Sequence, residues 1–228
     1  MPTLATSDPV RLDARLSACA GYLRPGVPVA DVGCDHGKLT AYLALQGFAV
    51  VGTDIHTAPL ETARATCAAA GCLDRVSLRL GNGLAPLAPG EVGQAVLAGI
   101  SAATILQILD AAPWVRTPGF RLALCPATKT PLLRRELARR GFALLDETPV
   151  VAAGRCYAVL CAEYDGQPRQ PTGEFCLMGL SLGKPHAGAL RDDTACKLEK
   201  QIRGMAPGAE REESLRLLDW LRSLSLPD

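Results

Sequence analysis

The chain has 228 residues, of which 48% are hydrophobic, and 24 Lys and Arg residues against 23 Asp and Glu residues give a formal net charge of +1. A chain of this length can bury a large core. A net charge near zero excludes a general attraction to nucleic acids or anionic membranes, so a polyanion site would have to be a local patch. No uncharged run approaches the roughly 18 residues of a membrane span. We therefore expect a cytoplasmic protein without membrane contact.

Apolar periodicity predicts strands that alternate with helices along the first part of the chain. A helical pattern over residues 12–23 ends at Pro25-Gly26. Strands are expected at 29–32, 49–53, 76–80, 94–98 and 120–125, with helices at 39–45, 60–69, 103–110 and 132–140. Residues 143–151 and 156–164 predict a closing hairpin. This order predicts an α/β fold with a mostly parallel sheet and an antiparallel edge.

A polar, Pro-rich stretch at residues 165–171 is a candidate boundary between two parts of the chain. It divides the chain into a domain of residues 1–165 and an extension of residues 166–228. Two charged helical segments, at about 190–203 and 210–224, are expected to form an antiparallel pair. We expect this pair to contact a large substrate or a second subunit, and the oligomeric state is left open.

The stretch from Val29 to Leu39 is the feature around which the domain is organised. An apolar run ends at Asp31, and the turn that follows carries Gly33 and Gly37 before a helical pattern begins. Glycines allow a ligand to approach the backbone closely, and the helix N-terminus offers unpaired N–H groups. The spacing differs from the dinucleotide fingerprint G-x-G-x-x-G, so a nicotinamide dinucleotide is the least favoured ligand. It resembles motif I of the methyltransferases that bind S-adenosylmethionine, whose positive charges suit an acidic strand end.

Two further polar residues end predicted strands. Asp54 lies about 20 residues beyond the glycine turn, where an acid that binds a ribose is expected, although a helix-cap role is the alternative. Asn82, between Gly81 and Gly83, is a candidate for the adenine edge of a cofactor or a simple turn residue.

Charged clusters elsewhere carry weaker predictions. Arginines 134, 135, 139 and 140 on one predicted helix, near Lys129, suggest a phosphate-backbone patch to which Arg15 contributes, or a solvated helix face. Asp35 and His36 have no third ligand at metal spacing, and the nine cysteines show no paired C-x-x-C pattern. We therefore expect reduced cysteines, mostly buried, and no metal site.

Together these motifs resemble the TrmK family, bacterial enzymes that use S-adenosylmethionine to methylate N1 of adenine 22 in tRNA. The resemblance covers about residues 10–164 and rests on segments that follow one another in order: Arg15-Leu16, residues 30–37, Thr53-Asp54-Ile55, residues 79–84, Leu97-Ala98-Gly99, Arg134 with Gly141-Phe142, and Gly154-Arg155-Cys156-Tyr157. It implies a Rossmann-like class I methyltransferase fold with a C-terminal helical extension, S-adenosylmethionine as cofactor and tRNA as partner.

Site residues follow from the same resemblance. The cofactor would be bound by Asp31, Gly33, Asp35, His36, Gly37, Asp54, Ile55, Asn82, Gly83 and Ala98. The substrate side would comprise Arg15, Gly99, Ile100, Ser101, Pro126, Arg134 and Arg135. No catalytic base is identified.

The chain departs from the family pattern at Asn82, where the family usually has an aspartate, and at two places on the substrate side. It has Ala98-Gly99-Ile100-Ser101-Ala102 where the family usually has Ala-Gly-Met-Gly-Gly, and Cys125-Pro126-Ala127 where it usually has Gln-Pro-Asn. The added Cβ atoms and the lost polar group lie where a base must approach. The alternatives to tRNA methylation are therefore a changed substrate, either another RNA or a small molecule, and a cofactor-binding protein without activity.

Overall fold

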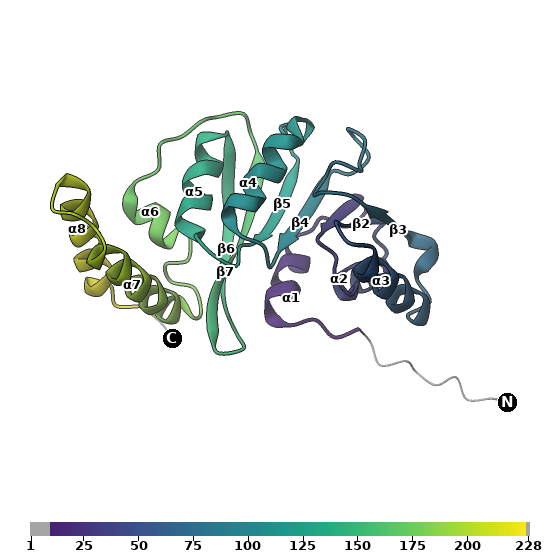
Figure 1. The fold of residues 1–228 in the computed structure, drawn as a ribbon, viewed down its shortest axis with the longest axis horizontal. Coiled ribbons are helices and arrows are strands. Elements are labelled where there is room, and N and C mark those ends of the chain that lie inside the picture. Colours follow the sequence, from purple (N-terminus) through teal and green to yellow (C-terminus); the bar gives the residue numbers. More distant parts are fainter. Residues whose placement is uncertain (1–9, 227–228) are drawn as a thin grey trace.

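The computed structural model describes residues 10–226 and contains one seven-stranded sheet with the order β3-β2-β1-β4-β5-β7-β6 (Figure 1). The strands are β1 (Val29–Val32), β2 (Val50–Asp54), β3 (Val76–Leu80), β4 (Gln94–Ala98), β5 (Arg121–Cys125), β6 (Phe142–Ala152) and β7 (Arg155–Tyr164). The helices are α1 (Ala14–Gly21), α2 (Lys38–Leu45), α3 (Thr57–Ala69), α4 (Ala102–Ala111), α5 (Thr130–Arg139), α6 (Gly173–Met178), α7 (Ala187–Arg203) and α8 (Ala209–Ser223), with short 3₁₀ turns η1 (Leu73–Arg75) and η2 (Pro113–Val115).

The predicted fold class is confirmed. Strands β1 to β5 pair in parallel and alternate with helices, whereas β7 pairs antiparallel with both β5 and β6. Because parallel strands end at the same edge, the loops after β1, β2, β4 and β5 meet at one side of the sheet. The hairpin β6–β7 closes the sheet with a register irregularity between Leu144 and Asp146.

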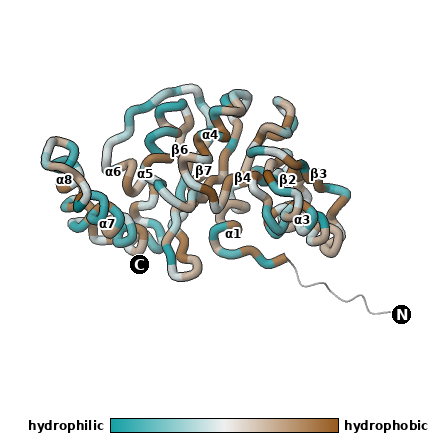
Figure 2. Tube along the Cα trace, in the orientation of Figure 1, coloured by the Kyte–Doolittle hydropathy of each residue, from teal (hydrophilic) through white to brown (hydrophobic). Residues whose placement is uncertain are grey.

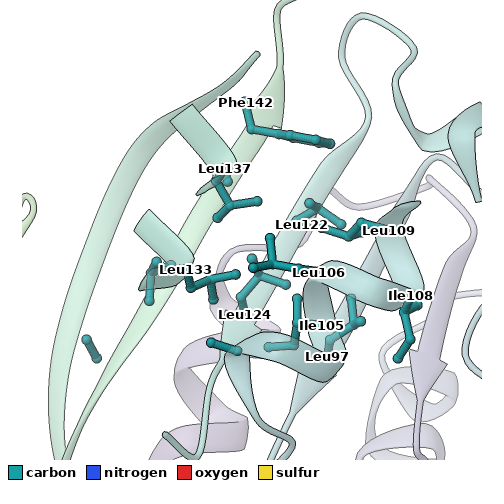
Figure 3. Packing of buried hydrophobic residues seen from close by; sticks show 14 of the residues in the cluster. Leu97, Ile105, Leu106, Ile108, Leu109, Leu122, Leu124, Leu133, Leu137 and Phe142 are labelled. Atoms are coloured by element: carbon teal, nitrogen blue, oxygen red, sulfur yellow. The ribbon is translucent and has the colours of Figure 1, made fainter. Parts of the chain in front are cut away.

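Two hydrophobic cores lie on the two faces of the sheet, and alternate residues of the central strands enter each of them. On β5, Leu122 and Leu124 belong to one core, and Ala123 and Cys125 to the other. The first core includes α4 and α5, and Figure 3 shows their leucines and isoleucines packed with Leu97, Leu122 and Leu124. The second core includes α1 and α2. Because both faces of these strands are buried, their sequences are continuous apolar runs and do not alternate between apolar and polar residues.

Helix boundaries differ from the expected ones where capping residues decide them. The first helix begins at Ala14 because Asp13 caps it by accepting a hydrogen bond from the backbone N–H of Leu16 at 3.0 Å. The helix expected at 60–69 begins earlier, at Thr57, with Pro59 in its first turn. Proline is tolerated there because the first backbone N–H groups of a helix have no partner within the helix.

The C-terminal helices lie beside the β6–β7 edge, at the opposite end of the sheet from α2 and α3 (Figure 1). The expected helices at 190–203 and 210–224 correspond to α7 and α8, which pack against each other and are largely hydrophilic on the outside (Figure 2). Their buried leucines join the core of the sheet, as Leu198 and Leu221 do. The division into residues 1–165 and 166–228 stays a prediction, and residues 1–9 and 227–228 lie outside the described range.

The nine cysteines are all free in the structure, and seven of them are buried, which confirms the expectation that most of them are buried. Within residues 10–226 no helix is both long and apolar enough to cross a bilayer. Residues 10–226 also contain no group of three or more His, Cys, Asp or Glu side chains that could hold a metal ion.

Candidate functional site

The turn after β1 is fixed to the neighbouring strand β2 by backbone hydrogen bonds. The N–H groups of Gly33 and Cys34 both donate to the carbonyl oxygen of Thr53, at 2.8 and 2.9 Å. Gly33 and Gly37 each have a φ of +72°, a conformation that residues with a Cβ rarely adopt. A Cβ on Gly37 would lie 2.7 Å from the backbone of Ala63, so this glycine also permits the close packing of α3.

Asp35 and His36 form the exposed rim of this turn. Asp35 also has a positive φ, of +47°, and its Oδ2 lies 2.6 Å from Nδ1 of His36. The carbonyl oxygen of His36 accepts a hydrogen bond from Thr66 of α3 at 2.8 Å. The turn is therefore anchored on α3, a contact that the sequence did not indicate.

Asp31 is a buried carboxyl group at the end of β1. It accepts a hydrogen bond from the hydroxyl group of Thr40 at 2.6 Å. Burial raises the pKa of Asp31 from 3.8 to about 6, an increase that the hydrogen bond from Thr40 opposes. A cation placed beside this group would favour its charged form.

Asp54 ends β2 and connects the glycine turn to the start of α3. Its carboxylate accepts hydrogen bonds from the backbone N–H groups of Asp35, at 3.3 Å, and His56, at 3.0 Å. Next to it, Ile55 is 59% exposed, although it is a large apolar residue. The turn that carries Asn82 and Gly83 is tied to the same strand, because the hydroxyl group of Thr53 donates to the carbonyl oxygen of Gly83 at 2.8 Å.

A cavity of about 550 Å³ lies at the glycine turn, and we call it the glycine-turn cavity. Its walls come from α1, the glycine turn, α3 and the ends of β4 and β5. The predicted site residues that line it are Arg15, Asp31, Gly33, Asp35, His36, Ala98 and Gly99. Sequence reasoning missed the wall from α3, Thr62 and Thr66, since threonine on a helix carries no signal of a binding site.

A second cavity, of about 590 Å³, lies between the loop after β5 with the start of β7 on one side and the C-terminal helices on the other, and we call it the hairpin cavity. One wall consists of residues 126–131 and 155–158, and the other of Leu177 and residues on α7. Lys129 and Arg155 are exposed there, and neither has an ion-pair partner among residues 10–226. On the opposite wall, Lys197 is paired with Asp193 at 2.5 Å.

Arg15 and Tyr157 connect the two cavities. Arg15 lines the glycine-turn cavity, Tyr157 lines the hairpin cavity, and the guanidinium carbon lies 5.0 Å from the centre of the tyrosine ring. Cys125 and Pro126, adjacent in the chain, line one cavity each. The ends of β4 and β5 therefore form the boundary at which groups bound in the two cavities would meet.

The expected arginine patch on α5 is wrong for Arg134. Its side chain is only 1% exposed, and its Nε lies 2.8 Å from Oε1 of Glu147. Arg139 and Arg140 also bind carboxylates, since both contact Glu136 and Arg140 additionally contacts Asp110. The helix face is thus largely neutralised, by Glu136 on the same helix and by Asp110 and Glu147 from other elements.

Of the remaining predicted residues, Pro126 and Arg134 line the hairpin cavity, and the others lie beside the cavities without lining them. Gly37 lies in the glycine turn itself, Asp54 and Ile55 lie at the end of β2, and Asn82 and Gly83 follow β3. Arg135 is exposed on α5. The hydroxyl group of Ser101 caps α4 by accepting from the N–H of Thr104 at 3.1 Å. Ile100 packs on the first core, and its carbonyl oxygen accepts the N–H of Ala127 at 2.8 Å. Pro126 lines the hairpin cavity, whereas Ile100 and Ser101 do not.

Comparison with known proteins decides the family. Residues 12–160 match the family model described as a methyltransferase domain. The chain is 32% identical over 176 residues to the tRNA (adenine(22)-N(1))-methyltransferase of Bacillus subtilis (strain 168), a match that covers 76% of this chain and 74% of the relative. The chain belongs to the TrmK family.

Solved structures of TrmK proteins share the whole architecture, including the C-terminal helices. The B. subtilis m1A22 tRNA methyltransferase TrmK superposes with a TM-score of 0.77 at 26% identity, over 93% of this chain and 97% of that one. TrmK of M. capricolum, solved with S-adenosylhomocysteine, superposes with a TM-score of 0.76 at 18% identity, over 92% and 96% of the two chains. The resemblance to TrmK and the Rossmann-like methyltransferase fold expected from the sequence are both confirmed.

Proposed function

We propose that this TrmK-family protein transfers the methyl group of S-adenosylmethionine to N1 of an adenine in tRNA, at the position equivalent to adenine 22, in the cytoplasm. The observation that carries this proposal is the junction of the two cavities at the ends of β4 and β5. One cavity has acidic residues at a glycine turn, and the other has exposed cations and an aromatic ring.

The glycine-turn cavity suits the charge of S-adenosylmethionine. Asp31 and Asp35 line it, and carboxylates favour the sulfonium and amino groups of this cofactor. Gly33 has no neighbouring atom within 4 Å of an added Cβ, so the turn leaves open space on that side. Asp54 would accept hydrogen bonds from the ribose hydroxyl groups, and the exposed side chain of Ile55 would cover the adenine. When bound, the cofactor supplies an activated methyl group.

The hairpin cavity would hold the acceptor nucleotide. Aromatic rings bind unpaired bases by stacking, and Tyr157 presents its ring beside the boundary between the cavities. Lys129 and Arg155 would contact phosphate groups, in place of the arginine patch that was expected on α5. A base in a paired or stacked context would have to leave its stack to reach this point.

For methyl transfer the protein has mainly to align the methyl group with the acceptor nitrogen. Adenine N1 carries a lone pair that attacks the methyl carbon while the bond from that carbon to sulfur breaks and sulfur takes the electron pair. No strong base is needed for this attack. Arg15, Tyr157 and the strand ends would therefore act by orienting the base and excluding water.

The departures from the family pattern leave the boundary between the cavities open. Ile100 packs on the core, and residues 100–102 line neither cavity. The loops after β4 and β5 are joined by backbone hydrogen bonds, from Gly99 to Cys125 at 2.9 Å and from Ala127 to Ile100 at 2.8 Å, which do not depend on side-chain identity. This geometry favours an active enzyme over a protein that only binds the cofactor. Two departures change a cavity wall, since Cys125 lines the glycine-turn cavity and Ala127 lines the hairpin cavity.

The test is methyl transfer to unmodified tRNA. The protein is incubated with labelled S-adenosylmethionine and tRNA transcripts, and the product is mapped by primer extension, which stops at N1-methyladenine. We expect one stop, at adenine 22, and its loss when that adenine is replaced by guanine. Binding of S-adenosylhomocysteine without transfer to any tRNA would contradict the proposal and favour the binding-only alternative.

A further inference from the structure

A buried ion pair joins the sheet to the first C-terminal helix. Arg134 of α5 donates from Nε to Oε1 of Glu147 on β6, at 2.8 Å. Its Nη1 donates to the carbonyl oxygens of Cys176 and Leu177, both at 2.7 Å. The other carboxylate oxygen, Oε2 of Glu147, accepts the backbone N–H of Leu180 at 2.5 Å. We call this arrangement the Arg134–Glu147 clamp.

The clamp fits a specific backbone conformation at the end of α6. Gly179 has a φ of +55°, and a Cβ added to it would lie 1.7 Å from Oε2 of Glu147. The backbone at this point therefore lies directly against the carboxylate. The carbonyl groups that Arg134 binds belong to the C-terminal end of the helix, where partial negative charge accumulates and a cation is favourable.

The clamp determines where the outer wall of the hairpin cavity stands. Leu177 of α6 lines that cavity, together with residues on α7 such as Leu190 and Lys197. Helix α6 packs against α5, α7 and α8, and α7 also packs directly on β6 and β7, so α6 and these strands together place the outer helices. Arg134 itself lines the hairpin cavity, although its side chain is almost fully buried.

This buried ion pair contributes more to the position of α6 than to the free energy of unfolding. Removing two charges from water costs several kcal/mol per ion, and apolar residues of similar size often stabilise a protein as well. Moreover, Nη2 of Arg134 is buried without a hydrogen-bond partner among the described residues. Apolar contacts alone would let α6 shift along the sheet. The hydrogen bonds from Arg134 to two carbonyl groups and from the N–H of Leu180 to Glu147 are directional, so they allow only one position of α6.

We propose that the Arg134–Glu147 clamp is a positioning device that holds the C-terminal helices over the hairpin cavity and so sets the affinity for the acceptor RNA without contacting it. This inference rests on the proposed function and concerns the same cavity. Arg134 and Glu147 are positioning residues, because they act through α6.

The first experiment compares E147Q with E163Q in the full-length protein. Glu163 pairs with Arg121 on the same sheet, at 3.0 Å, and does not line the hairpin cavity, so it is a matched control for losing a carboxylate. We expect E147Q to raise the KM for tRNA about tenfold, because a small displacement of a binding wall is costly, and to leave the affinity for S-adenosylhomocysteine unchanged. Hydrogen exchange should become faster in residues 173–203. E163Q should change none of these quantities, and equal effects of the two variants would overturn the proposal.

The second experiment separates positioning from direct contact and from stability. Removing a residue that contacts a phosphate lowers the salt slope of tRNA binding by about 1, and we expect this for K129A but not for E147Q or R134M. The double variant R134M/E147M removes both charges, and we expect a folded protein whose KM for tRNA stays raised. A normal KM in a stable double variant, or a reduced salt slope in R134M, would overturn the positioning role.

Failure of the inference is distinguishable from failure of the proposed function. If the unaltered protein methylates no tRNA, the proposed function fails, and the exchange rates of residues 173–203 still test the clamp. If the unaltered protein methylates tRNA and E147Q shows normal exchange and normal KM, the clamp fails alone.

Discussion

The guanidinium group of Arg15 lies 5.0 Å from the centre of the Tyr157 ring, at the boundary between the two cavities. Arg15 belongs to α1 and also pairs with Asp13 at 2.6 Å, whereas Tyr157 belongs to β7. A cation near the face of an aromatic ring is attracted by its quadrupole, so the pair fixes the ring orientation. This relationship places an aromatic surface where cofactor and acceptor would meet.

Replacing Tyr157 tests that surface. We expect Y157A to lower kcat/KM for tRNA methylation by roughly 5- to 100-fold, because base stacking on an aromatic ring contributes about 1–3 kcal/mol. Y157F keeps the ring and should retain most of the activity. The affinity for S-adenosylhomocysteine, measured by calorimetry, should be the same in both variants. Equal activity of Y157A and Y157F would show that no base stacks there.

Asp54 tests the ribose end of the cofactor site. We expect D54N to weaken S-adenosylmethionine binding by roughly 10- to 100-fold, because hydrogen bonds to a charged group contribute about 1.5–3 kcal/mol. The amide oxygen of Asn can still accept the N–H of His56, so the fold should persist. D74N is the matched control, since Asp74 is an exposed aspartate in η1. Calorimetry that finds equal affinities for the two variants would contradict the ribose role.

Asp31 gives cofactor binding a pH dependence of predictable sign. Burial raises the pKa of Asp31 to about 6, so in the free protein this carboxyl group becomes protonated as the pH falls below that value. A positively charged cofactor prefers the carboxylate, and binding must then displace the proton. We expect the Kd for S-adenosylmethionine to be constant above about pH 7 and to rise about tenfold by pH 5, since one pH unit below a pKa corresponds to one factor of ten.

Two variants identify the titrating group in that profile. D31N should bind more weakly at all pH values and show a flat profile. H36Q changes the neighbouring titratable residue of the turn and should preserve the profile. Affinity that increases as the pH falls would have the wrong sign and would exclude Asp31 as the group.

Replacing Gly33 and Gly37 by alanine in turn distinguishes the cost of backbone strain from the cost of steric overlap. Both have a φ of +72°, but a Cβ meets nothing within 4 Å at Gly33, whereas at Gly37 it lies 2.7 Å from the backbone of Ala63. We expect G33A to lower the free energy of unfolding by about 1–2 kcal/mol through strain alone. G37A should lower it by about a further 1–3 kcal/mol, because α3 must move. Urea denaturation of the unliganded protein measures both values, and equal losses would show that α3 moves without cost.

The sequence by itself determined the strand–turn–helix unit from Val29 to Leu45 and the alternation that follows it. These features are local, since the apolar runs define buried strands and the glycines permit the positive φ angles that the turn requires. The acid at the end of β2 was also predictable, because its distance from the turn follows from the length of one helix and one strand. The family resemblance added the cofactor and the substrate.

Only the tertiary structure decided what the arginines and the aromatic residue do. Arg134 looks like any solvated helical arginine in the sequence, and it is buried because Glu147 and the end of α6 fold onto it from distant positions. Tyr157 meets Arg15 although the two residues are far apart in the sequence, and no spacing rule connects them. Local patterns specify backbone conformation and the face that a segment buries, whereas the partner of a side chain depends on which segments pack together, and that choice is made by the whole chain.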